Sequence, residues 1–224
     1  MRREFDVAAE AEYYKKHPPS PWAEESNELV DTLMRFTAGD NWASFLCSRD
    51  VLEIGAGECT YLPRLLEKGR PARYVASDIF EDRFNAAREA IGATYSTLEF
   101  RTLRADHIDV DNESFDTVLA FGLFHHIPRL GAAFKEINRV LRLGGALIFR
   151  DPYVGNPLIW LKYSIIERSE NEWPLGRSRT RRMLDLAGFD VERCSRFWLR
   201  FPNLPAGPWS TNVGFVAKKT VAIS

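Results

Sequence analysis

Apolar positions along this chain alternate between blocks typical of buried strands and stretches with helical spacing. Five short apolar blocks predict strands, at residues 51–54, 73–76, 98–103, 117–121 and 146–149. Helical spacing fills three of the intervals between them, at residues 61–68, 81–91 and 131–141. Strands separated by helices in this way predict right-handed crossovers on a parallel sheet.

Elements are also predicted on both sides of this alternation. Residues 22–36 have apolar side chains at helical spacing, and we expect this helix to cover one face of the sheet. A helix at 179–187 ends at Gly188, a typical stop. Residues 189–198 and 209–217 alternate like strands, and without a helix between them they must pair antiparallel. The predicted fold is α/β: a doubly wound, mostly parallel seven-stranded sheet with an antiparallel last strand and helices on both faces.

Two segments are expected to lie over the sheet. Residues 1–40 form an N-terminal arm and the covering helix, and residues 41–224 form the main domain with an insertion at about 151–176. Long insertions in compact domains are usually functional, and this one is rich in aromatic residues. The alternatives are a small core under a long loop and, for the apolar residues 158–166, a helix on a membrane surface. We expect a lid that includes Tyr13, Trp22, Trp160, Tyr163 and Trp173.

Composition restricts the partners and the compartment. The chain has 224 residues and a net charge of −1, which does not favour nonspecific attraction to nucleic acid. Cys47, Cys59 and Cys194 are widely spaced, which fits a reducing compartment and argues against a zinc site. No stretch approaches the roughly eighteen apolar residues of a membrane span, and no signal peptide is apparent. We expect a cytoplasmic monomer or homodimer with no metal, no nucleic-acid partner and no stable membrane insertion.

Polar chemistry gathers where the predicted strands end, which is where ligands of such sheets bind. The first strand enters the glycine turn Gly55-Ala56-Gly57, which opens a helix whose amide groups face the same crevice. Asp78 ends the second strand, where a carboxylate is placed to accept hydrogen bonds from ribose hydroxyls. Asp106 follows the third strand, where it is placed to accept from the amine of an adenine. Both residues also fit ordinary solvated loop carboxylates.

Two adjacent histidines follow the fourth strand. His125 and His126 are expected at the mouth of the crevice, where a side chain with a pKa near neutrality fits a proton acceptor. Because neighbouring side chains of an extended chain point in opposite directions, we expect only one to serve and the other to be structural. Asp151 follows the fifth strand, where it is placed to orient a histidine. The adjacent Pro152 also fits a turn that Asp151 caps.

Six segments, in order and correctly spaced, resemble the motifs of class I S-adenosylmethionine-dependent methyltransferases, in the small-molecule, methyltransferase type 11-like branch. They are VLEIGAGECT at 51–60, SDI at 77–79, RADHID at 104–109, FDTVLAFGLFHHI at 115–127, VLRLGGALIF at 140–149 and LAGFDV at 186–191. The resemblance covers about residues 50–149, more loosely the rest. It implies a Rossmann-like fold in which Gly144-Gly145 is a structural turn.

The resemblance implies S-adenosylmethionine as the cofactor and S-adenosylhomocysteine as the product. One departure is Cys59, which stands where the family often has a third glycine. We expect Cys59 to line the cofactor and not to act as a nucleophile. From the methionine end to the adenine, the implied cofactor site consists of Glu53, Gly55, Ala56, Gly57, Asp78, Ile79, Asp106, His107 and Phe121, with Tyr14 of the arm expected beside it.

A mechanism follows in outline. A sulfonium methyl group is already activated, so alignment of the acceptor and exclusion of water dominate the rate gain. A base is needed only when the acceptor is protonated, for example a hydroxyl. We hypothesise that His125, helped by Asp151, removes that proton. The aromatic lid favours a small acceptor that is aromatic or partly apolar.

Other functions stay open. An NAD-dependent oxidoreductase uses the same turn and acidic residue, although its fingerprint favours Gly or Ala where Thr60 stands. A non-catalytic nucleotide-binding protein shares the fold, although the loss of Asp78 or the glycines that would indicate it is not seen. A nucleic-acid methyltransferase is disfavoured, because amino-directed DNA enzymes of this fold carry Asn/Asp-Pro-Pro-Tyr after strand four, and the chain shows no basic groove.

Overall fold

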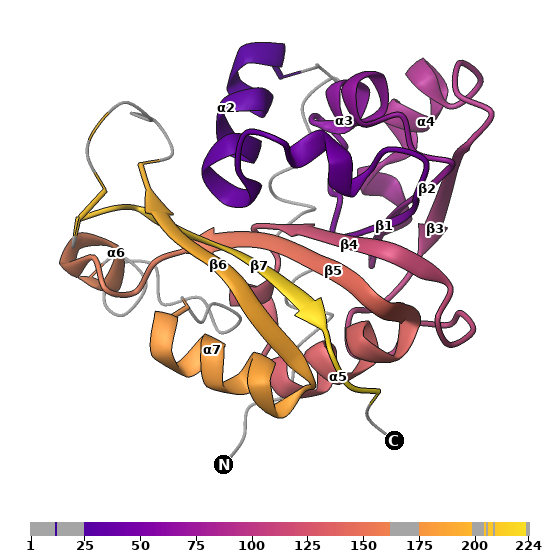
Figure 1. The fold of residues 1–224 in the computed structure, drawn as a ribbon. Helices are drawn as coiled ribbons and strands as arrows, with labels where there is room; N and C mark the ends of the chain where they lie inside the picture. The colour runs from indigo at the N-terminus through magenta and orange to yellow at the C-terminus, as the bar shows by residue number, and fades with distance from the viewer. Residues whose placement is uncertain are drawn as a thin grey trace.

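A seven-stranded sheet forms the centre of the computed structural model, with helices packed on both faces (Figure 1). The structure describes residues 12, 25–161, 175–198, 204, 206–207 and 209–222. In this part of the chain the strand order is β3-β2-β1-β4-β5-β7-β6. The strands are β1 (Asp50–Ile54), β2 (Arg73–Asp78), β3 (Leu98–Thr102), β4 (Phe115–Phe121), β5 (Leu141–Pro152), β6 (Phe189–Phe197) and β7 (Asn212–Lys219).

The strand directions confirm the predicted sheet. Each neighbouring pair from β3 to β5 is parallel, whereas β7 is antiparallel to both β5 and β6. As predicted, the consecutive strands β6 and β7 pair antiparallel. The order reverses between β1 and β4, and this switch point is where doubly wound sheets bind ligands.

Two buried clusters hold the helices on the sheet. One lies under α2, α3 and α4, and the other under α5 and α7, on the opposite face (Figure 1). The helices are α2 (Asn27–Ala38), α3 (Leu62–Gly69), α4 (Asn85–Ile91), α5 (Leu130–Val140), α6 (Pro157–Leu161) and α7 (Arg177–Leu186), and the 3₁₀ turns are η1 (Trp42–Phe45), η2 (Glu81–Arg83) and η3 (Phe124–His126).

Two predicted elements differ from the structure. The helix expected at 81–91 is interrupted at Phe84, between η2 and α4, where a fully buried ring stacks on Phe100 at 5.5 Å. The buried position of this ring accounts for the place at which the helix is interrupted. The expected turn at Gly144-Gly145 lies inside β5, at an irregularity in its pairing with β4. The φ of Gly144 is +77°, so glycine permits a bulge and the strand continues through it.

The covering helix is confirmed as α2. Ser26 caps it by accepting a hydrogen bond from Leu29 N at 3.3 Å. Its far end is tied to β6, because Ser195 Oγ donates to Phe36 O at 2.6 Å and the Phe36 ring stacks on Phe197 at 5.6 Å. The chain before α2, apart from residues 12, 25 and 26, lies outside the described residues. The expected lid residues Tyr13, Trp22, Tyr163 and Trp173, and the expected cofactor residue Tyr14, also lie outside them.

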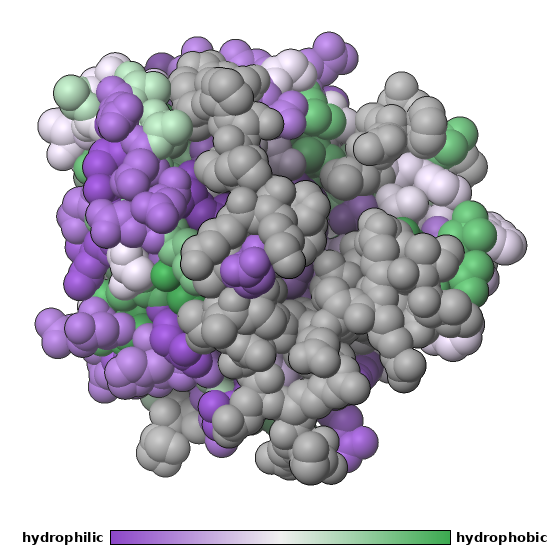
Figure 2. Space-filling model, turned by 180° about the vertical axis from the view of Figure 1, so that it is seen from behind, coloured by the Kyte–Doolittle hydropathy of each residue, from purple (hydrophilic) through white to green (hydrophobic). Residues whose placement is uncertain are grey.

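Apolar side chains on the face drawn in Figure 2, and the lengths of the described helices, bear on contact with a membrane. In Figure 2, apolar side chains appear among the coloured atoms as small separate groups between polar ones. Within the ranges that the structure describes, no helix has both the length and the apolar character needed to cross a bilayer.

Four phenylalanines connect the core to the loop after β4. Phe149 of β5 is fully buried, and its ring centroid lies 4.9 Å from that of Phe124, 5.8 Å from Phe134 and 4.9 Å from Phe215. Phe124 is the first residue of η3, so its burial holds the turn that carries His125 and His126.

We predict that Phe149→Ala lowers the free energy of unfolding by about 3–5 kcal/mol, because it leaves a cavity among three other rings. Urea unfolding measures this loss. Amide exchange in η3 should also become faster, whereas Phe149→Leu should cost less than about 1.5 kcal/mol. Unchanged exchange in η3 despite the full loss of stability would show that Phe149 does not hold this turn.

Candidate active site

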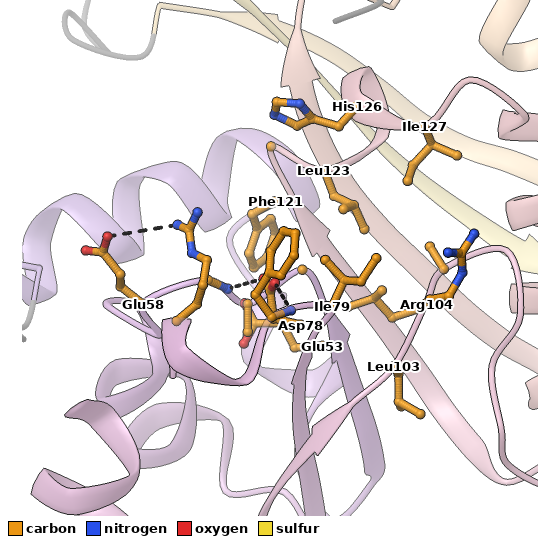
Figure 3. Close-up of a pocket in the computed structure, with 18 of the residues that line it drawn as sticks. Glu53, Glu58, Asp78, Ile79, Leu103, Arg104, Phe121, Leu123, His126 and Ile127 are labelled. Carbon is orange, nitrogen blue, oxygen red and sulfur yellow. Dashed lines mark hydrogen bonds and ion pairs between the residues drawn. The ribbon is translucent and has the colours of Figure 1, made fainter. Parts of the chain in front are cut away.

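A cavity of about 340 Å³ opens at the carboxyl ends of β1, β2 and β4. Its walls come from the glycine turn, from the loops after β2 and β3, and from the loop after β4. In Figure 3, Glu53, Asp78 and Ile79 lie on one side, and Leu123, His126 and Ile127 lie on the other. The switch point of the sheet and the largest group of predicted site residues therefore coincide.

The glycine turn has the predicted geometry. The φ angles of Gly55 and Gly57 are +71° and +54°, in the left-handed region that favours glycine. A Cβ atom on Gly55 would lie 2.8 Å from Leu123 Cδ1, so the turn also needs glycine for its close approach to the opposite wall. Ala56 N donates to Ser77 O at 2.8 Å, which joins the turn to the end of β2.

Asp78 is part of this turn and not a solvated loop carboxylate. It is 8% exposed, its Oδ2 accepts from Gly57 N at 2.9 Å, and its Oδ1 accepts from Phe80 N at 3.1 Å (Figure 3). Burial raises the pKa of this carboxyl group. Each carboxylate oxygen has a second lone pair, so Asp78 keeps the capacity to accept from two ribose hydroxyls.

Glu53 is a second buried acid at the cavity. It is 4% exposed and accepts a hydrogen bond from Tyr74 Oη at 2.7 Å. Burial raises its pKa from the ordinary 4.5 to about 7, and the charge of Asp78 adds to the increase. Close to neutral pH, Glu53 therefore exchanges between a neutral hydrogen-bond donor and a carboxylate that a cation would stabilise.

The two residues predicted for the adenine differ in their relation to the cavity. Asp106 lines the cavity, and its oxygens accept from Arg104 Nε at 3.1 Å and Nη2 at 3.2 Å. Leu103, Arg104 and Ala105 line the same end, which leaves a mixed polar and apolar slot. His107 is not among the described residues that line the cavity.

The two histidines lie side by side and do not point in opposite directions as expected. They belong to the 3₁₀ turn η3 and not to an extended segment, and their ring centroids are 3.9 Å apart. His126 lines the cavity, whereas His125 lies behind it and is 7% exposed. The turn therefore places one ring at the wall and the other directly behind it.

Asp151 lies within hydrogen-bond reach of a histidine, as expected. Its Oδ1 is 2.7 Å from His125 Nδ1 and accepts from His125 N at 3.1 Å. Asp151 in its carboxylate form only accepts, so this contact suits the His125 tautomer with a proton on Nδ1. Asp151 is fully buried, and no partner for its Oδ2 occurs among the described residues.

Comparison with known proteins identifies the domain. Residues 52–149 match a family model described as a methyltransferase domain. A fatty-acid O-methyltransferase of Mycolicibacterium smegmatis is 34% identical over 104 residues, which are 45% of this chain and 36% of that protein. A tRNA U34 carboxymethyltransferase of Nautilia profundicola is 28% identical over 103 residues, 45% of this chain and 33% of that protein. The chain thus spans about a third of the length of these relatives.

Solved structures share the fold. One chain of the complex between the Haloferax volcanii Trm112 methyltransferase activator and a methyltransferase aligns with a TM-score of 0.69 and 18% identity, over 99% of this chain and 100% of that chain. The trans-methyltransferase CalH, in complex with S-adenosylhomocysteine, aligns with a TM-score of 0.62 and 20% identity, over 86% of this chain and 55% of that chain. Residues 52–149, which are less than half of the chain, are thus similar to a methyltransferase domain, and the fold is that of S-adenosylmethionine-dependent methyltransferases. This similarity supports S-adenosylmethionine as the cofactor.

In this methyltransferase domain, Cys59 does not line the cofactor cavity as expected. It is 2% exposed and packs in the buried cluster beneath the turn. Its φ of +57° explains why glycine is favoured at this position, since side chains rarely adopt that conformation. Burial raises the pKa of its thiol, which agrees with the expectation that it is not a nucleophile.

Other cavity residues of the methyltransferase domain were missed by sequence reasoning. Arg150 ends β5, and its Nη2 donates to Tyr61 Oη at 2.7 Å. The available sequence signal is the period-two alternation of the strand, which places Arg150 on the face of the sheet opposite Asp151. In contrast, Trp160 of α6 is 50% exposed and is not among the described lining residues. The described residues include no group of three or more His, Cys, Asp or Glu side chains that could hold a metal ion.

Glu53 predicts a pH dependence of stability. Since its pKa is higher in the folded protein, the folded state binds more protons than the unfolded state between pH 4.5 and about 7. The free energy of unfolding should therefore fall as the pH rises through this range, by on the order of 3 kcal/mol from Glu53. Urea unfolding of the cofactor-free protein at about pH 5 and about pH 8 measures the change.

Glu53→Gln serves as the control for this prediction, because it keeps the shape but does not titrate. The difference in the pH dependence of the free energy of unfolding between wild type and variant gives the contribution of Glu53, because Asp78 titrates in both proteins. Identical pH dependences in the two proteins would rule out the raised pKa.

Proposed function

We propose that this chain transfers the methyl group of S-adenosylmethionine to a small-molecule acceptor, and that the acceptor atom is oxygen. The observation that carries this proposal is one cavity with a cofactor-binding turn on one wall and a histidine on the other. The family model supports methyl transfer. The arrangement of the walls supports a protonated acceptor, since only such an acceptor needs a base.

The cofactor is proposed to lie along the ends of β1, β2 and β3. Asp78 accepts from the ribose hydroxyls, and Ile79 and Asp106 flank the adenine. The methionine part crosses the glycine turn toward Phe121 at the end of β4. This path uses cavity residues on three neighbouring strands and leaves the loop after β4 for the acceptor.

The acceptor is proposed to be small and partly apolar. Leu123, Ile127 and Pro128 line the acceptor side of the cavity beside His126. An apolar wall with one polar group suits an apolar molecule with a single hydroxyl group. The relative named fatty-acid O-methyltransferase supports this class. The relative named tRNA U34 carboxymethyltransferase represents the competing class, which the net charge of −1 disfavours.

His126 is proposed as the base in place of His125, because it is the histidine at the cavity wall. It takes the proton of the acceptor O–H group while the oxygen forms a bond to the methyl carbon. The bond between carbon and sulfur breaks, and its electron pair stays on sulfur as the thioether of S-adenosylhomocysteine. His125, held by Asp151 at 2.7 Å, packs against His126 and positions its ring.

Cofactor binding tests the first part of this proposal. Isothermal titration should show micromolar binding of S-adenosylmethionine and S-adenosylhomocysteine, and no comparable binding of NAD. Asp78→Ala should abolish this binding, because it removes the ribose acceptor and the bonds that hold the turn. Asp78→Asn should retain part of it. Tighter binding of NAD would instead support the oxidoreductase alternative.

Turnover tests the second part, with a panel of phenols as acceptors, because their hydroxyl groups are protonated at neutral pH. His126→Ala should lower kcat by about 10²- to 10⁴-fold and leave S-adenosylhomocysteine affinity unchanged. His125→Gln should have a smaller effect on kcat, because it removes only the support of the ring. An unchanged kcat in His126→Ala, or a larger loss in His125→Gln, would contradict this assignment.

A further inference from the structure

Arg150 is a buried cation at the wall of the cavity. It is 7% exposed, and its guanidinium lies over the rings of Tyr61 and Phe121, at 5.3 Å and 5.5 Å from their centroids. The guanidinium forms one hydrogen bond to a described residue, the neutral hydroxyl of Tyr61. No described carboxylate forms an ion pair with it. Arg150 lines the cavity without a direct ion pair among the described residues, and its charge acts on the Glu53 carboxyl group only through space.

Such an arrangement is costly unless a ligand completes it. A buried guanidinium cannot release its proton, and cation-π contacts compensate only part of its desolvation. Its five N–H groups form a planar fork that matches a carboxylate through two parallel hydrogen bonds. With one N–H group bound to Tyr61, the fork still has donors for one anion.

We infer that Arg150 is the carboxylate-binding residue of this cavity, and that the carboxylate is the amino-acid end of the cofactor. This inference rests on the proposed function. Glu53 and Arg150 supply opposite charges from the same cavity, on β1 and β5, with Phe121 of β4 between them. Strand pairing shows the arrangement: Glu53 pairs with Leu119, and Arg150 pairs with Phe121 two residues further along β4.

A zwitterionic group matches this pair of charges. Its ammonium group fits beside Glu53, whose carboxylate form a cation stabilises, and its carboxylate fits the fork of Arg150. A carboxylate of the acceptor has the same chemistry and is the other source to be tested.

Two ligands separate these sources. S-adenosylhomocysteine carries the amino-acid end, whereas 5′-methylthioadenosine has the same nucleoside and thioether sulfur without it. Arg150→Met should weaken S-adenosylhomocysteine binding by about 10- to 100-fold and leave 5′-methylthioadenosine binding unchanged. Arg150→Lys, which keeps the charge but not the fork, should fall between. Arg193→Met, at an exposed arginine of β6, is the matched control and should change neither affinity.

Thermal unfolding of the ligand-free proteins distinguishes binding from a structural role. Removal of an unpaired buried charge should leave the Tm of Arg150→Met equal to or above that of the wild type. A structural arginine would instead lower the Tm, and both ligands would weaken together. That pattern would overturn the inference.

A further titration tests whether the carboxylate that Arg150 binds belongs to the acceptor. If S-adenosylhomocysteine binding is unchanged in Arg150→Met, octanoate is titrated into the saturated wild type and variant. Octanoate binding that is lost in the variant would keep Arg150 as the carboxylate-binding residue and assign the carboxylate to the acceptor. No effect on any ligand would overturn the inference. If the wild type binds neither nucleoside, the proposed function fails, and octanoate titration of the free protein still decides the role of Arg150.

Discussion

The hydrogen bond from Gly57 N to the Asp78 carboxylate, at 2.9 Å, is the contact on which the cofactor half of the site depends. It joins the turn after β1 to the end of β2, and Ala56 N reinforces it through Ser77 O. A positive φ at Gly57 directs the amide toward the carboxylate, so glycine and acid are needed together. The acid that is expected to bind the ribose therefore also shapes the turn beneath the methionine part.

The end of β5 organises the other half of the site through the alternation of a strand. Arg150 and Asp151 are neighbours, so their side chains project to opposite faces of the sheet. Arg150 reaches Tyr61 on the side of α2 and α3, and Asp151 reaches His125 on the side of α5. One strand end thereby supplies a buried cation to the cavity and a buried acceptor to the histidine turn.

Sequence reasoning could predict the features that depend on local pattern. The mostly parallel sheet with an antiparallel last strand follows from the alternation of strands and helices, and the positions of Gly55, Gly57 and Asp78 follow from where the predicted strands end. It was wrong about the orientation of His125 and His126, because it assumed an extended chain where burial of Phe124 produces a 3₁₀ turn. It missed Arg150, because the absence of a counter-ion is a property of three-dimensional packing. The lid and the expected location in the cytoplasm stay predictions.

The charges of the cavity are the physical basis for our proposal that a zwitterionic cofactor suits it better than a neutral nucleoside. Burial raises the pKa of both Glu53 and Asp78, so each carboxylate is less favourable in the folded protein than in water. The guanidinium of Arg150 is buried without an ion pair among the described residues. A ligand with an ammonium, a sulfonium and a carboxylate group offers opposite charges to both kinds of residue. Part of its binding free energy then comes from relief of unfavourable charges in the empty site, which couples cofactor binding to the stability of the fold.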